Sequence, residues 1–79
     1  MPYIDTKTKD KVHQFGPRTP GELNFAITEV LIGYLKEKKE SYQTYNDIMG
    51  ALEGAKLELA RRKIFPYEDK KIAENGDCY

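Results

Sequence analysis

The sequence of 79 residues contains one cysteine, Cys78, and one histidine, His13. A disulfide within the chain needs two cysteines, and a structural zinc site needs four ligands of these types, so both are excluded. Chains of this size bury only about 60% of their unfolded surface and therefore have a thin core. Without such cross-links, we expect self-association to supply stability, and we expect no metal and no cofactor.

Net charge and long apolar runs are also missing. Lysine and arginine number 13, and aspartate and glutamate also number 13. A neutral chain lacks the positive field that drives binding to DNA or RNA, so we do not expect nucleic acid as a partner. No segment approaches the roughly 18 apolar residues of a membrane span, and the N-terminus has no signal-peptide core. We expect a soluble cytoplasmic protein without a membrane partner, because an unpaired cysteine fits a reducing compartment.

Residues 1–18 are polar and charged and show no helical period, so we expect an extended N-terminal arm in which His13 is solvated. The next segment has the chemistry of a helix start: Thr19 suits the cap, Pro20 the first helical position and Glu22 the capping box. Apolar residues then recur at intervals of three and four, namely Leu23, Ala26, Ile27, Val30, Leu31, Tyr34 and Leu35. This pattern predicts an amphipathic helix that ends in the charged run at 36–40.

A second helix is predicted for SYQTYNDIMGALEGAKLELARRKIF, with Ser41 or Thr44 as its cap. One face of this helix is apolar and carries Tyr45, Ile48, Met49, Leu52, Ala55, Leu59 and Ala60. Proline neither donates a backbone hydrogen bond nor favours a helical residue before it, so Pro66 predicts a break or kink at Ile64–Phe65. A short third helix is then expected to end at Asn75–Gly76 in a glycine cap.

Two long helices with a short connection predict an all-α fold. We expect residues 19–79 to form one helical domain, an antiparallel two-helix hairpin plus the short C-terminal helix, preceded by the arm at 1–18. The hairpin leaves a second apolar patch on each helix, because some apolar residues lie away from its inner faces. Gly50 and Gly54 lie inside the second predicted helix, where each glycine costs about 1 kcal/mol relative to alanine. We therefore expect another helix or a ligand to approach this part of the helix closely. These positions predict a homo-oligomer interface at Phe25, Ile32, Gly50, Gly54 and Leu57.

Three stretches of the sequence resemble a family of small proteins encoded by tailed phages and prophages. They are TPGELNFAIT, YNDIMGALEGAKLELARR and PYEDKKIAENGDCY, and the family has segments of the type PGELNYAIT, NDIIGALEGAKLEFYRR and APYEDKKIEENGDVY. The resemblance covers most of residues 19–79 and departs at Ala60, where an aromatic residue is frequent, and at Cys78, where valine is usual. It implies the cytoplasm of an infected or lysogenic bacterial host, where small phage proteins often bind host components. It assigns no functional residue.

The densest basic cluster is Arg61–Arg62–Lys63, in the last turn of the second predicted helix. Such residues complement the helix dipole, which is one explanation of the cluster. The other explanation is ligand binding, because arginine binds phosphate oxygens with two parallel hydrogen bonds and tyrosine rings stack on bases. A nucleotide-like ligand would then contact Arg61, Arg62, Tyr67, Tyr45, Asn46, Gly50 and Gly54.

The sequence contains no nucleophile–base pair and no metal-ligand set, so we expect a protein that is not an enzyme. Two functions fit the remaining features. The first is an oligomer that sequesters a phosphate-bearing, nucleotide-like ligand such as a host immune signal, which would be an anti-defence function. The second is a protein–protein module that inhibits a host enzyme or acts as a small structural adaptor.

Overall fold

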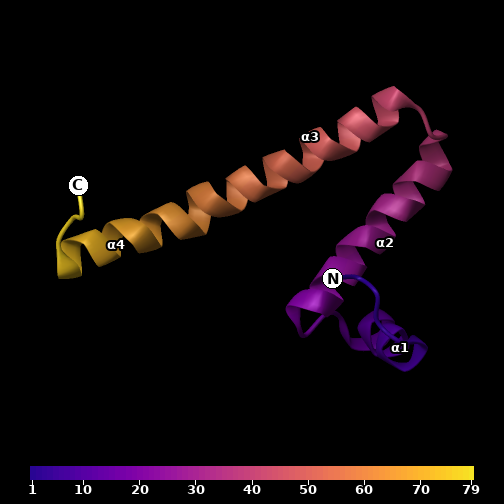
Figure 1. Cartoon of the computed structure of the whole chain (residues 1–79), viewed down its shortest axis with the longest axis horizontal. Helices are drawn as coiled ribbons and strands as arrows, with labels where there is room; N and C mark the ends of the chain where they lie inside the picture. Colours follow the sequence, from indigo (N-terminus) through magenta and orange to yellow (C-terminus); the bar gives the residue numbers. More distant parts are fainter. The chain divides into compact units, whose positions relative to one another are not determined.

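The computed structural model describes residues 1–79, which form helices and no strand. The elements are α1 (Thr6–Phe15), α2 (Pro20–Lys38), α3 (Tyr42–Leu59), a π-helical turn η1 (Ala60–Ile64) and α4 (Phe65–Asn75) (Figure 1). The predicted all-α class is confirmed. The chain divides into two compact units, unit 1 (Met1–Thr44) and unit 2 (Tyr45–Tyr79). The hairpin arrangement and the domain boundary after residue 18 stay predictions.

The N-terminal segment is not the extended arm that the sequence predicts, because residues 6–15 form α1. This helix is explained by hydrogen bonds that cap its two ends, because its sequence has too few apolar residues to show a helical period. The Asp5 carboxylate accepts a hydrogen bond from the backbone N–H of Thr8 at 2.8 Å. At the other end, Gly16 has φ +83°, and its N–H donates to the carbonyl of Val12 at 2.8 Å. Glycine adopts this backbone conformation without the strain of a side chain.

The core of unit 1 lies between α1 and α2. Val12 of α1 and Phe25 of α2 are the buried apolar residues, with 6% and 8% of their surface exposed. Across the same interface, Nε2 of His13 lies 2.7 Å from a carboxylate oxygen of Glu29. The His13 ring also contacts Phe25, with 5.8 Å between ring centroids. His13 is exposed, as predicted, with 54% of its side-chain surface accessible. The sequence did not predict that it lies in a helix or that it joins α1 to α2.

Helix α2 begins as predicted. The Thr19 hydroxyl accepts a hydrogen bond from the N–H of Glu22 at 3.1 Å, and the Glu22 carboxylate accepts one from the N–H of Arg18 at 3.2 Å. The predicted apolar stripe of this helix is largely uncovered, since Val30, for example, is 71% exposed. Phe25 is buried instead, because α1 covers the side of α2 that the sequence pattern left without a partner.

The turn between α2 and α3 is closed by side-chain hydrogen bonds. Lys39 has a positive φ of 65°. Its carbonyl accepts a hydrogen bond from the Thr44 hydroxyl at 3.0 Å. The Ser41 hydroxyl accepts one from the N–H of Thr44 at 3.2 Å, so Ser41 rather than Thr44 caps α3. These bonds account for the burial of Thr44, which is 7% exposed.

In unit 2 the chain stays helical from α3 through η1 into α4 (Figure 1). Of the predicted break or kink at Ile64–Phe65, the break was therefore wrong; the irregularity is a π-helical turn just before Phe65. The N–H of Phe65 donates to the carbonyl of Ala60, five residues back, instead of four. This wider turn gives the ring of Pro66 room beside the carbonyl of the preceding turn, with which it would collide in a regular α-helix. The predicted glycine cap of α4 is confirmed: Gly76 has φ +89°, and its N–H donates to Ile72 at 2.8 Å.

The start of α1 is expected to be sensitive to acid. Hydrogen bonds from the side chain and then the backbone of Thr8 lower the pKa of the Asp5 carboxyl group below 3.8. A lowered folded-state pKa means that the cap stabilises α1 fully above pH 3.8 and loses this effect as the pH falls through the folded-state value. Circular dichroism should show a loss of helix in this acid range.

The matched variant for this prediction is Asp5→Asn, since asparagine caps a helix without titrating there. The variant should keep the helical signal at neutral pH and lack the part of the acid transition that comes from Asp5. Identical acid titrations of the two proteins would contradict the prediction.

Candidate interaction surface

The helix of unit 2 has no side chain in a core, because no residue from Tyr45 to Tyr79 is buried. Most of its large apolar residues in α3, η1 and α4 are between 43% and 66% exposed: Tyr45, Met49, Leu57, Leu59, Ile64, Phe65, Tyr67 and Ile72. Ile48 and Leu52 of α3 are half-buried. Residues of these types usually fill protein interiors. A helix that exposes apolar residues on more than one side and buries none of them within its unit has the properties of a binding surface.

The two glycines of α3 face open space. A Cβ atom added at Gly50 or Gly54 would meet no atom within 4 Å. Together the two glycines cost about 2 kcal/mol relative to alanine in a helix interior. The packing within one chain therefore gives no reason for them. The prediction that something outside the chain approaches this face stays a prediction.

The residues predicted to bind a nucleotide-like ligand do not meet in one place on unit 2. Tyr45 and Asn46 lie near the start of α3, whereas Tyr67 lies in the first turn of α4. A separation of 21 residues along a helix corresponds to about 30 Å, more than a small ligand spans. Among the charged and aromatic residues of this set, Arg61, Arg62 and Tyr67 are close enough in sequence to contact one small molecule together.

The positive charges of that cluster are partly neutralised inside the chain. Nε of Arg62 lies 2.9 Å from one oxygen of Glu58, and Nη1 of Arg61 lies 3.9 Å from the other. Next along the chain, Nζ of Lys71 lies 5.6 Å from the ring centre of Tyr67. All of these groups are exposed, so their ion pairs are weak and a phosphate group would have to displace Glu58.

The residues predicted to form an oligomer interface differ in their surroundings. Phe25 is buried under α1, which means that it is not part of an exposed patch. Ile32 and Leu57 are exposed by 46% and 55%, and Gly50 and Gly54 have open space beside them. The sequence pattern identified Phe25 as a residue away from the main stripe of α2 but missed that α1 covers it.

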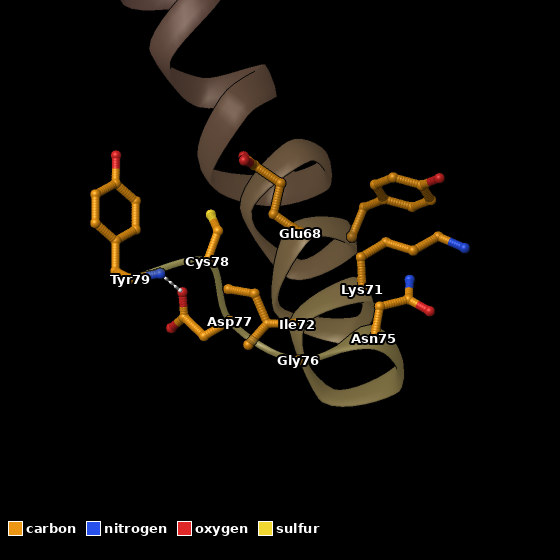
Figure 2. Close-up of a pocket in the computed structure, with 9 residues that line it drawn as sticks. Glu68, Lys71, Ile72, Asn75, Gly76, Asp77, Cys78 and Tyr79 are labelled. Carbon is orange, nitrogen blue, oxygen red and sulfur yellow. Dashed lines mark hydrogen bonds between the residues drawn. The ribbon is translucent and has the colours of Figure 1, made fainter.

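A groove of about 460 Å³ lies between α4 and the segment that follows it. The chain turns at Gly76, and Cys78 and Tyr79 then run back beside Ile72 and Glu68 (Figure 2). The N–H of Tyr79 donates to the Asp77 carboxylate at 2.9 Å, which holds this return in place. The sequence indicated the turn at Gly76 but gave no signal for the groove.

A second hollow, of about 310 Å³, lies in unit 1. Its walls include Tyr3, Lys9, Phe25, Glu29 and Ile32. Nζ of Lys9 lies 5.8 Å from the ring centre of Phe25, and Glu29 is the partner of His13. The hollow depends on α1, so the prediction of an extended arm could not reveal it.

The structure shows neither a metal centre nor a membrane-spanning helix. It brings together no group of three histidine, cysteine or acidic residues that could hold a metal ion. None of its helices combines the length and the hydropathy that crossing a membrane requires. The features that remain for a function are the uncovered helix of unit 2, its basic cluster and the two hollows.

Comparison with known proteins identifies a family. The model of one family, the domain of unknown function DUF6899, matches residues 1–78. The chain belongs to this DUF6899 family. Comparisons with curated proteins and with solved structures gave no match. Because the DUF6899 match spans both units, α1 and the helix of unit 2 are parts of the same family domain.

Proposed function

We propose that this DUF6899 protein is a small, non-catalytic protein–protein interaction module of phage or prophage origin, which binds a host protein through the helix of unit 2. The observation that carries the proposal is the complete absence of buried residues in that helix, despite its many large apolar side chains. The phage setting comes from the resemblance of the sequence, and inhibition of an enzyme or adaptor function would both use this surface.

The energetics of helices support this function. Isolated helices are only marginally stable in water, since most of their stability in proteins comes from packing of an apolar face. The helix of unit 2 has no such packing within its unit. Its exposed leucine, methionine and aromatic side chains are residue types that contribute strongly when a helix lies in an apolar groove of a partner. The apolar contacts with a partner would therefore provide the binding affinity and would also stabilise α3 and α4 as helices.

Sequestration of a nucleotide-like ligand is the second candidate. The closeness of Arg61 and Arg62 to Tyr67 in η1 and α4 favours it. It ranks second because Glu58 pairs with both arginines and because Tyr45 and Asn46 lie about 30 Å from Tyr67. Such a ligand would need residues from more than one chain, whereas a protein partner would use the helix as it is.

The test is a capture experiment in which the protein is immobilised through Cys78, the only cysteine and an exposed one. The wild type and the double variant Leu57→Ala, Phe65→Ala are compared in lysate of a bacterial host. The partner should bind the double variant about 10- to 100-fold more weakly, because two exposed apolar contacts are lost. Val30→Ala in α2, at a residue that is 71% exposed, is the control and should retain the partner.

Two results would contradict the proposed function. The first is equal capture of every protein by the wild type and the double variant. The second is a clear rise in melting temperature with members of a nucleotide panel in the absence of any protein partner, which would favour the second candidate.

A further inference from the structure

The hollow of about 310 Å³ in unit 1 is lined by apolar residues from two separate segments. We call it the unit 1 hollow, since all of its lining residues belong to unit 1. Helix α2 contributes the ring of Phe25, which is 8% exposed, and the side chain of Ile32. The N-terminal segment contributes Pro2 and Tyr3. Apolar walls of this kind are typical of sites that bind small molecules.

The N-terminal segment lies against the start of α2. The N–H of Ile4 donates to the carbonyl of Pro2 at 3.1 Å, which closes a tight turn. Gly21 lies in the first turn of α2, and a Cβ atom there would lie 3.2 Å from the carbonyl oxygen of Met1. The missing side chain of Gly21 therefore lets the segment pass close to the helix. The wall that Pro2 and Tyr3 form is thus present before any ligand binds.

The polar groups of the unit 1 hollow differ in whether the chain already uses them. Both oxygens of the Glu29 carboxylate lie close to Nε2 of His13, at 2.7 and 2.9 Å. The Thr28 hydroxyl donates to a backbone carbonyl of its own helix at 2.8 Å. The Lys9 ammonium lies 5.8 Å from the ring centre of Phe25 and forms no ion pair. A ligand with a negative charge could bind Lys9 without displacing an acidic residue.

From these observations we propose that the unit 1 hollow binds a small carboxylate that carries one aromatic ring. The Lys9 ammonium would donate hydrogen bonds to the carboxylate, and the ring would lie against Phe25 and Tyr3. A volume of about 310 Å³ is at the lower end for ligand sites, which favours a molecule with one ring over a nucleotide. The site uses no residue of unit 2, so it goes beyond the proposed function and is tested separately from it.

An NMR titration of the whole chain with 3-phenylpropanoate tests the proposal. We expect a dissociation constant of about 1 mM, which fits the affinity that ligands gain per non-hydrogen atom. The backbone amide signals of Lys9, Phe25 and Ile32 should shift, whereas those of unit 2 should not. The uncharged 3-phenylpropanamide should bind about 10-fold more weakly, because it lacks the charge that Lys9 binds.

A matched pair of lysine variants tests the role of Lys9. Methionine keeps an apolar stem over Phe25 and has nearly the same helix propensity as lysine, so Lys9→Met should leave α1 folded. This variant should raise the dissociation constant of 3-phenylpropanoate about 10-fold. Lys7→Met removes the same charge from an exposed residue of α1 that does not line the hollow. It should change the constant by less than about twofold.

A matched pair of tyrosine variants tests the aromatic wall. Tyr3 and Tyr42 both belong to unit 1 and are 83% and 80% exposed, so neither truncation removes a buried side chain. Only Tyr3 lines the hollow. Tyr3→Ala should weaken binding of 3-phenylpropanoate about threefold, because one aromatic contact is lost, and Tyr42→Ala should leave it unchanged.

Three results would overturn the proposal. The first is the absence of shifts in unit 1 up to about 10 mM 3-phenylpropanoate, roughly ten times the expected dissociation constant. The second is equal affinity for the carboxylate and the amide, and the third is equal affinity of Lys9→Met and the wild type. Each of these results leaves the proposed function in place, because capture of a partner by the helix of unit 2 does not use the unit 1 hollow.

Discussion

Phe25→Ala should detach α1 from α2 and unfold it. Phe25 is 8% exposed and, with Val12, forms the entire buried apolar core of unit 1. Truncation of a buried phenylalanine to alanine typically costs about 3–5 kcal/mol, which exceeds what a helix of ten residues gains from its own hydrogen bonds. The ring is also the surface on which His13 and Lys9 lie, so both contacts disappear with it.

Hydrogen exchange measured by NMR is the direct readout for this prediction. Backbone amides of residues 10–15 should lose protection in Phe25→Ala, while those in the middle of α2 keep part of theirs. The control is Phe15→Ala, since Phe15 is 59% exposed and its ring lies beside Arg18, whose guanidinium carbon is 5.2 Å from the ring centre. The control should change stability by less than about 1 kcal/mol. Equal loss of protection in both variants would show that Phe25 is not the core of unit 1.

The outcome for α1 explains what could be predicted from the sequence and what could not. The start of α2 was predictable because Thr19, Pro20 and Glu22 act within four residues of one another and need no tertiary contact. Helix α1 was not, because its cap at Asp5 lacks a capping-box partner and its apolar residues are too few for a period. Its buried residue Val12 lies at the same interface as Phe25, which comes ten residues after the end of the helix, and we expect the stability of α1 to depend on this contact.

The same dependence on distant contacts decides which face of α2 is buried. Periodicity correctly located an apolar stripe, but Leu23, Ile27 and Val30 are exposed while Phe25 is covered. A single sequence shows which residues share a face and does not show which face another element will cover. For the candidate site, the sequence pattern placed Tyr45 and Gly50 on the second predicted helix and Tyr67 beyond the expected break or kink at Ile64–Phe65. Only the continuity of the helix in the structure showed how far apart they lie.

Pro66→Ala should stabilise the helix of unit 2 and remove its π-helical turn. Alanine supplies the N–H that proline lacks and has no ring to collide with the carbonyl of Arg62. In a regular helix interior this exchange is worth about 3 kcal/mol, and the wider turn at η1 already relieves part of that cost, so we expect a gain of about 1–3 kcal/mol. Urea unfolding followed by circular dichroism measures the gain. Pro20→Ala is the control, because proline at a first helical position costs nothing, and no gain is expected there.

The change of hydrogen bond in Pro66→Ala is measurable in its own right. The N–H of Phe65 now donates to Ala60, and in the variant it should donate to Arg61, which NMR couplings across hydrogen bonds report. Persistence of the bond to Ala60 would contradict the view that proline causes the turn.

Conversion of the π-helical turn to a regular α-helical turn, which spans one residue fewer, also rotates α4 by about 100° relative to α3. Phe65 would then lie on a different side from Leu57, so a partner that contacts both should bind more weakly although the helix is more stable.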